Sequence, residues 1–174
     1  RLIYISTDQV YGDVKKHRET TVNLKPVNQY GSTKYLAELE TIKNHSNSVV
    51  VRTNIFGWNV KPGKTSSAEW IYHALKERSK INLFSDYLFS PVYSQCLGEI
   101  LLRIVDRKFV GIINIGSPVP CSKFEFGKTM ASIAGLDFSF VKEESMISFP
   151  SVARRAKDLT LNTDKATAIG LNIP

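Results

Sequence analysis

Leu2-Ile3-Tyr4-Ile5-Ser6-Thr7-Asp8 is the stretch that indicates the fold of this chain. It is a short apolar run that ends in small polar residues, which is typical of a strand in an open α/β sheet at the edge where the chemistry lies. A helix from about Asn28 to Asn44 follows, with Asn28 as its N-cap, and then a second apolar strand, Val49-Val50-Val51. A strand, a helix and a strand in this order predict a right-handed crossover and a parallel sheet.

The rest of the chain continues the alternation of helices and strands. We expect a helix at 67–79, a strand at 81–84, a helix at 94–106 that Ser90-Pro91-Val92-Tyr93 opens, a strand at 111–116, a helix to Gly135 and a short helix from about Thr163. Ser122 and Glu125 have the spacing of a capping box at the start of the helix that ends at Gly135. The pattern predicts an α/β fold.

Tyr30-Gly31-Ser32-Thr33-Lys34 has the layout of a proton relay. Residues four apart share one face of a helix, where the ammonium of Lys34 can stabilise the phenolate of Tyr30. Two other pairs have the same interval, Tyr11 with Lys15 and Tyr72 with Lys76. Only Tyr30 combines the first turn of a helix with an upstream strand that ends in Ser6 and Thr7. We therefore predict that only the Tyr30 pair is functional.

Composition and charge limit the classes of function. The chain has 174 residues, of which 43% are hydrophobic, and a formal net charge of +7. Its basic residues form short clusters without interleaved aromatic residues, which favours a phosphate-bearing small ligand over nucleic acid. No apolar run is long enough to span a bilayer. Cys96 and Cys121 are expected to be buried thiols in a reducing, cytoplasmic compartment, and the scattered histidines predict no metal site.

At four separate places the residues resemble an extended short-chain dehydrogenase/reductase of the sugar-nucleotide-modifying group. These blocks are 5–12, Tyr30 to Lys34, 52–57, and 84–86 through 90–93. A fifth block, 153–157 with 161–165, is similar to the dTDP-4-dehydrorhamnose reductase subgroup. Because no glycine-rich turn lies between a first strand and a first helix, the resemblance implies the C-terminal part of a doubly wound Rossmann-type sheet, with the glycine-rich half absent.

The resemblance implies an activity and roles for particular residues. Hydride would pass from NADP or NAD to the C4 ketone of a nucleotide-linked deoxy sugar, while Tyr30 delivers the proton. Thr7 would bond the carbonyl oxygen, Lys34 would hold the nicotinamide ribose, and Ser6 would touch cofactor or substrate or only end the strand. The substrate-binding residues would be Thr7, Asp8, Asn54, and Arg154 or Arg155 on the diphosphate, unless that arginine pair is only a solvated surface pair.

Three alternatives stay open. Dehydratases resembling this sequence have a glutamate after the Thr-Asp pair, whereas Gln9 stands there, and an amide cannot take a proton. Simple ketone reduction is therefore favoured over dehydration or epimerisation. The third alternative is a regulatory, nucleotide-binding subunit of the methionine adenosyltransferase type. Asn54 stands where rhamnose-type reductases often have an aromatic residue, which leaves the sugar open.

The resemblance also implies a division of the chain. Residues 1–58 and 94–118 would be the remainder of the Rossmann-type domain, and 59–93 and 119–174 a small α/β substrate-binding lobe. We expect Leu2 to Ile5 to lie in the middle of a larger sheet. Its raw edge would be covered by missing residues, a homodimer partner or another chain.

Overall fold

The computed structural model describes residues 1–13, 17–21, 24–61, 63–148 and 154–174. The predicted strand, helix and strand are present as β1 (Leu2–Ile5), α1 (Gln29–Asn44) and β2 (Ser48–Phe56). A short 3-10 helix, η1 (Asp8–Val10), follows β1. The Asn28 side chain accepts a hydrogen bond from the Gly31 N–H, as an N-cap does, and this sets where α1 begins.

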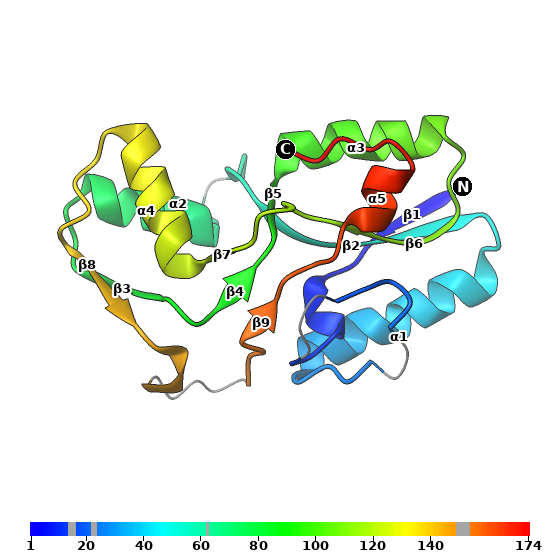
Figure 1. Cartoon of the computed structure of the whole chain (residues 1–174), viewed down its shortest axis with the longest axis horizontal. Coiled ribbons are helices and arrows are strands. Elements are labelled where there is room, and N and C mark those ends of the chain that lie inside the picture. Colours follow the sequence, from blue (N-terminus) through cyan, green and yellow to red (C-terminus); the bar gives the residue numbers. More distant parts are fainter. Residues whose placement is uncertain (14–16, 22–23, 62, 149–153) are drawn as a thin grey trace.

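The main sheet is parallel throughout, with β2 at its centre. Strand β1 pairs with the first half of β2, β6 (Gly111–Ile115) pairs with residues 49–53 of β2, and β5 (Pro91–Tyr93) pairs with residues 54–56. Helix α1 lies on one face of this sheet, and α3 (Ser94–Asp106) and α5 (Asp164–Ala168) lie on the other (Figure 1). The predicted α/β fold with a parallel sheet is confirmed.

A second lobe, at the left of Figure 1, packs its own core. Its elements are α2 (Ser67–Lys76), β3 (Ile81–Phe84), β4 (Leu88–Phe89), β7 (Cys121–Ser122), α4 (Lys123–Ala134), β8 (Val141–Glu144), the 3-10 helix η2 (Met146–Ser148) and β9 (Asp158–Leu159). Strand β3 pairs with β8, and β4 lies between β7 and β9. Capping boxes begin both helices, Ser66 with Glu69 in α2 and the predicted Ser122 with Glu125 in α4.

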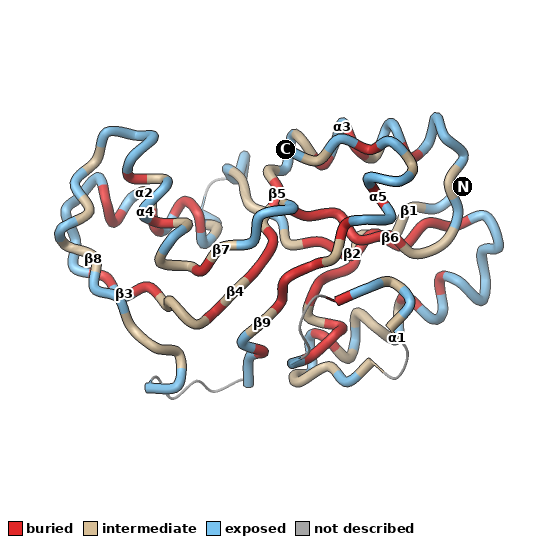
Figure 2. Tube along the Cα trace, in the orientation of Figure 1, coloured by how far each residue is buried: buried red, intermediate tan, exposed pale blue. Residues whose placement is uncertain are grey.

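The two largest clusters of buried apolar residues among the described ranges form the cores of the two lobes (Figure 2). The core of the main sheet joins strands β2 and β6 to helices α3 and α5, with Val51, Ile104, Ile113 and Ala166 all fully buried. The core of the second lobe lies between α2, α4 and β3. Because each lobe buries its own apolar side chains, the polar residues at the ends of β1 and β2 are left to face the space between the lobes.

The structure refines the predicted boundaries. The predicted helix at 94–106 is present as α3, and residues 91–93 before it form strand β5 of the main sheet, with Pro91 in the first position of the strand, where no N–H is needed. Helix α5 packs on the main sheet together with α3. Helix α2 ends at Lys76 because Arg78 turns the chain with a φ of 55°. The predicted division of the chain and the covering of the β1 edge stay predictions.

Some expectations concern single residues. Cys96 and Cys121 are both free thiols, but each is only partly buried, because each lies beside a core and not within one. Lys15 and Ala153, which the sequence interpretation used, lie outside the described residues. No helix in the described ranges is long and apolar enough to cross a membrane.

Candidate active site

Thr7, Asp8 and Asn54 form a hydrogen-bonded group at the carboxyl ends of β1 and β2. The Thr7 hydroxyl donates to Oδ1 of Asp8 over 3.1 Å, and Nδ2 of Asn54 donates to Oδ2 of Asp8 over 2.5 Å. Thr7 also caps η1 by accepting from the Gln9 N–H. Both oxygens of the Asp8 carboxylate are therefore engaged, and the strand ends are tied together through this one side chain.

Asp8 is buried, with an exposed fraction of 1%. Burial raises the pKa of Asp8 to about 6, although the hydrogen bonds from Asn54 and Thr7 and the positive charge of Lys123 oppose the shift. The carboxyl group therefore titrates close to neutral pH. A carboxyl group that changes its charge near neutral pH is typical of a site that binds a polar or ionic ligand.

Tyr30 and Lys34 lie where α1 begins, beside this group. Tyr30 is in the first turn of the helix and is 55% exposed. Nζ of Lys34 donates to the carbonyl oxygen of Ile5 over 2.6 Å and lies 4.3 Å from the centre of the Tyr4 ring. These contacts join α1 to the end of β1 and hold the ammonium at a fixed place.

Gly31 makes the close approach of α1 to η1 possible. A Cβ atom on Gly31 would lie 2.5 Å from the carbonyl oxygen of Gln9, closer than side-chain carbon atoms approach backbone oxygen. Oε1 of Gln9 in turn accepts from Nδ2 of Asn28 over 2.8 Å. The start of α1 is therefore fixed against the loop that carries Thr7 and Asp8.

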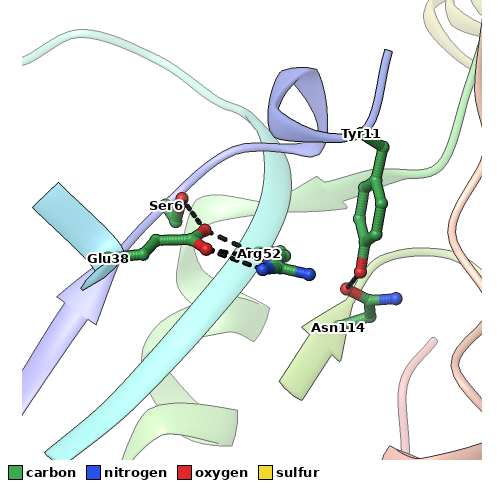
Figure 3. Close-up of polar contacts among 5 residues, drawn as sticks. All are labelled: Ser6, Tyr11, Glu38, Arg52 and Asn114. Atoms are coloured by element: carbon green, nitrogen blue, oxygen red, sulfur yellow. Dashed lines mark hydrogen bonds and ion pairs between the residues drawn. The ribbon is translucent and has the colours of Figure 1, made fainter. Parts of the chain in front are cut away.

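Ser6, which the resemblance placed near the cofactor, has its hydroxyl engaged inside the protein (Figure 3). It donates to Oε1 of Glu38 over 2.5 Å, and Glu38 is paired with Arg52, whose Nη2 lies 2.7 Å from Oε2. The hydroxyl of Tyr11, which follows η1, donates to Oδ1 of Asn114 on β6 over 2.8 Å. This geometry favours the other role expected for Ser6, ending the strand, and its contact with cofactor stays a prediction.

Two cavities meet at this place. One, of about 350 Å³, is lined by Ser6, Thr7, Asp8 and Lys34 among others. The other, of about 520 Å³, extends toward the second lobe, where Phe84, Tyr87, Lys123 and Arg155 line it. Gln9, Tyr30 and Asn54 line both cavities. Tyr30 therefore stands at the junction of two adjoining cavities.

The structure distinguishes Arg154 from Arg155, which the sequence alone could not do. Arg155 lines the larger cavity with Tyr30 and Asn54. Arg154 lies in a different hollow, with its guanidinium 3.6 Å from the Asp13 carboxylate and largely exposed. Arg155 is therefore the better placed of the two for a ligand in the larger cavity.

Lys123 also lines the larger cavity, although no sequence motif singles it out. This residue begins α4, and its Nζ lies 3.7 Å from the centre of the Phe89 ring. Burial lowers the pKa of Lys123 to about 8, against the opposing attraction of Asp8. The available signal was a lysine in the first turn of a helix, where the macrodipole disfavours a cation.

Residues 1–174 match the RmlD substrate binding domain. The chain belongs to this family. Among its members and relatives, the dTDP-4-dehydrorhamnose reductase of Mycolicibacterium smegmatis is 29% identical over 174 residues, covering 98% of this chain and 52% of that protein. The chain thus spans about half the length of this curated relative. These matches confirm the resemblance to the rhamnose-type reductases.

Solved structures agree with the family match. A dTDP-4-dehydrorhamnose reductase from Bacillus anthracis, in complex with NADP, superposes on this RmlD-type domain with a TM-score of 0.89 at 27% identity, covering 99% of this chain and 60% of that one. The dTDP-glucose 4,6-dehydratase of Streptomyces venezuelae has a TM-score of 0.76 at 19% identity, covering 99% and 54%. Because proteins described as reductases and dehydratases share this fold, the fold alone does not decide the reaction.

Proposed function

We propose that this chain is the substrate-binding part of an NADP- or NAD-dependent reductase that acts on the 4-keto group of a dTDP-linked deoxy sugar, with Tyr30 as proton donor. The observation that carries the proposal is the place of Tyr30 at the junction of the two cavities, with Lys34, Thr7 and Asp8 lining the smaller one. Relatives described as dTDP-4-dehydrorhamnose reductases support it.

The smaller cavity fits the nicotinamide end of a dinucleotide. Lys34 uses one of its three N–H donors on the Ile5 carbonyl, so two remain for ribose hydroxyls. The Tyr30 hydroxyl, at the positive end of the α1 macrodipole, is available for the same ligand. When bound, the nicotinamide supplies the hydride. The neighbour described as a complex with NADP supports this assignment.

In the proposed mechanism each residue of the group acts on the substrate ketone in a defined way. Tyr30 donates its hydroxyl proton to the ketone oxygen. Thr7 turns its hydroxyl from Asp8 toward the same oxygen, which requires only rotation about one single bond. Asp8 then keeps its bond from Asn54 and holds that amide toward the sugar. Arg155 binds the diphosphate from the larger cavity, because a guanidinium can donate two parallel hydrogen bonds to phosphate oxygens.

Gln9 favours reduction over dehydration. Its side-chain oxygen is engaged by Asn28, and an amide has no basic site for the proton that elimination would release. A regulatory subunit of the methionine adenosyltransferase type would keep the same fold. It would co-purify with a larger enzyme and would oxidise no NADPH with any keto sugar, whereas a reductase consumes NADPH.

The test compares two tyrosines with the same spacing to a lysine. In the full-length protein, with dTDP-4-dehydrorhamnose and NADPH, we expect Tyr30→Phe to lower turnover about a hundredfold or more, since general acid catalysis contributes this much. Tyr72→Phe is the matched control, because Tyr72 packs edge-on against Trp58 and the ring is kept. Unchanged turnover in Tyr30→Phe would refute the assignment.

A further inference from the structure

Lys123 lies where folding alone disfavours an ammonium group. It is the first residue of α4, at the positive end of the helix macrodipole. It is largely withdrawn from solvent against the rings of Phe89, Tyr87 and Phe126, whose centres lie 3.7, 5.6 and 5.9 Å from Nζ. The charge of Arg155 adds repulsion. An apolar side chain of the same length would avoid all three costs.

The Lys123 ammonium also has unused hydrogen-bonding capacity. Its compensating contacts are the faces of these three rings and the charge of Asp8, and none of them is a hydrogen bond. Within the described ranges, no oxygen accepts from Nζ. Because Lys123 lines the 520 Å³ cavity together with Tyr30 and Asn54, its three N–H donors are available to a ligand there.

The two cations of this cavity differ in depth. Arg155 is exposed at the rim, whereas Lys123 is partly buried and close enough to Asp8 for their charges to interact. Asp8 bonds directly to Thr7, the residue proposed to contact the reacting ketone. Lys123, the inner cation, therefore faces the end of a bound ligand that carries the reacting ketone. Arg155, the outer cation, faces the opposite end, which stays closer to water.

We propose that Lys123 is a further substrate-contacting residue, whose ammonium donates hydrogen bonds to the oxygen atoms of the sugar and so helps to select it. This inference rests on the proposed function, and it assigns the sugar to Lys123 and the diphosphate to Arg155. The aromatic rings around Lys123 hold the ammonium in place, as cation–π contacts do, so that it is oriented before the ligand arrives.

The experiment separates the sugar from the diphosphate by using two ligands. Calorimetric titration of the full-length protein with dTDP-rhamnose and with dTDP, in the presence of NADP, gives both affinities without any turnover. For Lys123→Met we expect about a tenfold or greater loss of affinity for dTDP-rhamnose, because a hydrogen bond from a charged group is lost. The affinity for dTDP should change less than about twofold. Lys128→Met, an exposed position on the same helix, should change neither affinity.

Each other result overturns the inference in a recognisable way. An equal loss for both ligands would place Lys123 on the diphosphate. Unchanged affinities would remove it from the binding site. If the wild-type protein binds neither ligand, the proposed function fails and this inference fails with it. If the wild-type protein binds both ligands and Lys123→Met binds them equally well, this inference fails but the proposed function stands. A thermal unfolding curve for each variant checks that the methionine, which matches the lysine stem in length, preserves the packing.

Discussion

Among the described residues, two pairs of opposite charge inside the molecule are built in different ways. Glu38 and Arg52 touch directly, with 2.7 Å between Oε2 and Nη2 and exposed side-chain fractions of only 1% and 2%. Asp8 and Lys123 interact through their charges, but Asp8 accepts its hydrogen bonds from Thr7 and Asn54, while Lys123 lies on the Phe89 ring. The first pair is closed, and the second opens onto a cavity.

The pKa values show what this difference means. Burial alone would lower the pKa of Arg52, but the hydrogen bonds and charge of Glu38 more than compensate, so that the pKa is raised. Asp8 and Lys123 receive less compensation, and burial moves their pKa values toward each other, to about 6 and about 8. The closed pair holds α1 against β2, whereas the open pair costs stability, which proteins accept at functional sites.

The largest expected effect comes from breaking the closed pair. Arg52→Met leaves the Glu38 carboxylate buried without its partner, which should cost about 3–5 kcal/mol of unfolding free energy. Urea unfolding of the full-length protein measures it. Arg78→Met is the matched control, because Arg78 pairs with Asp137 at 3.0 Å on the surface, with exposed fractions of 67% and 42%, and should cost less than about 1 kcal/mol. Similar losses in the two variants would contradict the distinction between the sites.

An effect of intermediate size should appear in the pH dependence of the unfolding free energy, through Asp8 of the open pair. Because the folded pKa of Asp8 is raised to about 6, the folded protein binds more protons than the unfolded chain between about pH 4 and pH 6. The Asp8 contribution therefore makes stability fall as pH rises through this window, by on the order of 2–3 kcal/mol. Asp8→Asn should remove this component of the curve.

Asp137 is the control, because its contribution to stability changes with pH in the opposite direction. The Ser139 N–H lowers the pKa of Asp137, so the Asp137 contribution to stability rises with pH and is lost at low pH. Asp137→Asn should therefore remove a slope of the other sign. Urea unfolding at a series of pH values measures both variants. If the Asp8→Asn curve is parallel to that of the wild type between pH 4 and 6, the raised pKa is wrong.

The smallest effect concerns the helix that carries Lys123. Ser122→Ala removes the side-chain oxygen that accepts from the Glu125 N–H and should cost about 1 kcal/mol of stability. It should also weaken dTDP-rhamnose binding slightly, because Lys123 follows the cap directly. Ser66→Ala, which breaks the equivalent box of α2, should cost a similar amount of stability. A Ser122→Ala variant with wild-type unfolding would show that the cap does not hold the start of α4.

Most of the fold could be predicted because its signals are local. The N-cap at Asn28, the capping box at Ser122 and the apolar strand from Val49 to Val51 each depend on residues a few positions apart, and the structure confirms all three. The pairings that the sequence did not predict are those that depend on a distant partner. Pro91 to Tyr93 becomes a strand only because β2 offers its edge, and α5 joins the main sheet only because β6 and α3 leave an apolar surface to cover.

The candidate site divides in the same way. The Tyr30-to-Lys34 motif could be singled out from its spacing together with its place at the start of a helix and after a strand that ends in Ser6 and Thr7, since a helix and a strand impose fixed periodicities on neighbouring residues. Their roles stay predictions until the variants are measured. Spacing could not show that Glu38 pairs with Arg52, or that Arg155 and not Arg154 lines the larger cavity. Nor could it place Lys123 beside Asp8, 115 positions away.

The sequence by itself determined the main helices, the strands at 2–5, 49–51, 81–84 and 111–116, and the caps at Asn28 and Ser122, because these follow from hydrogen bonds and side-chain periodicity within a few residues. Only the tertiary structure decided which charges meet. The packing of the second lobe against the main sheet brings α4 to the end of β1, and this withdraws Asp8 and Lys123 from water while leaving a cavity beside them. Burial, which depends on the whole fold, is what shifts both pKa values.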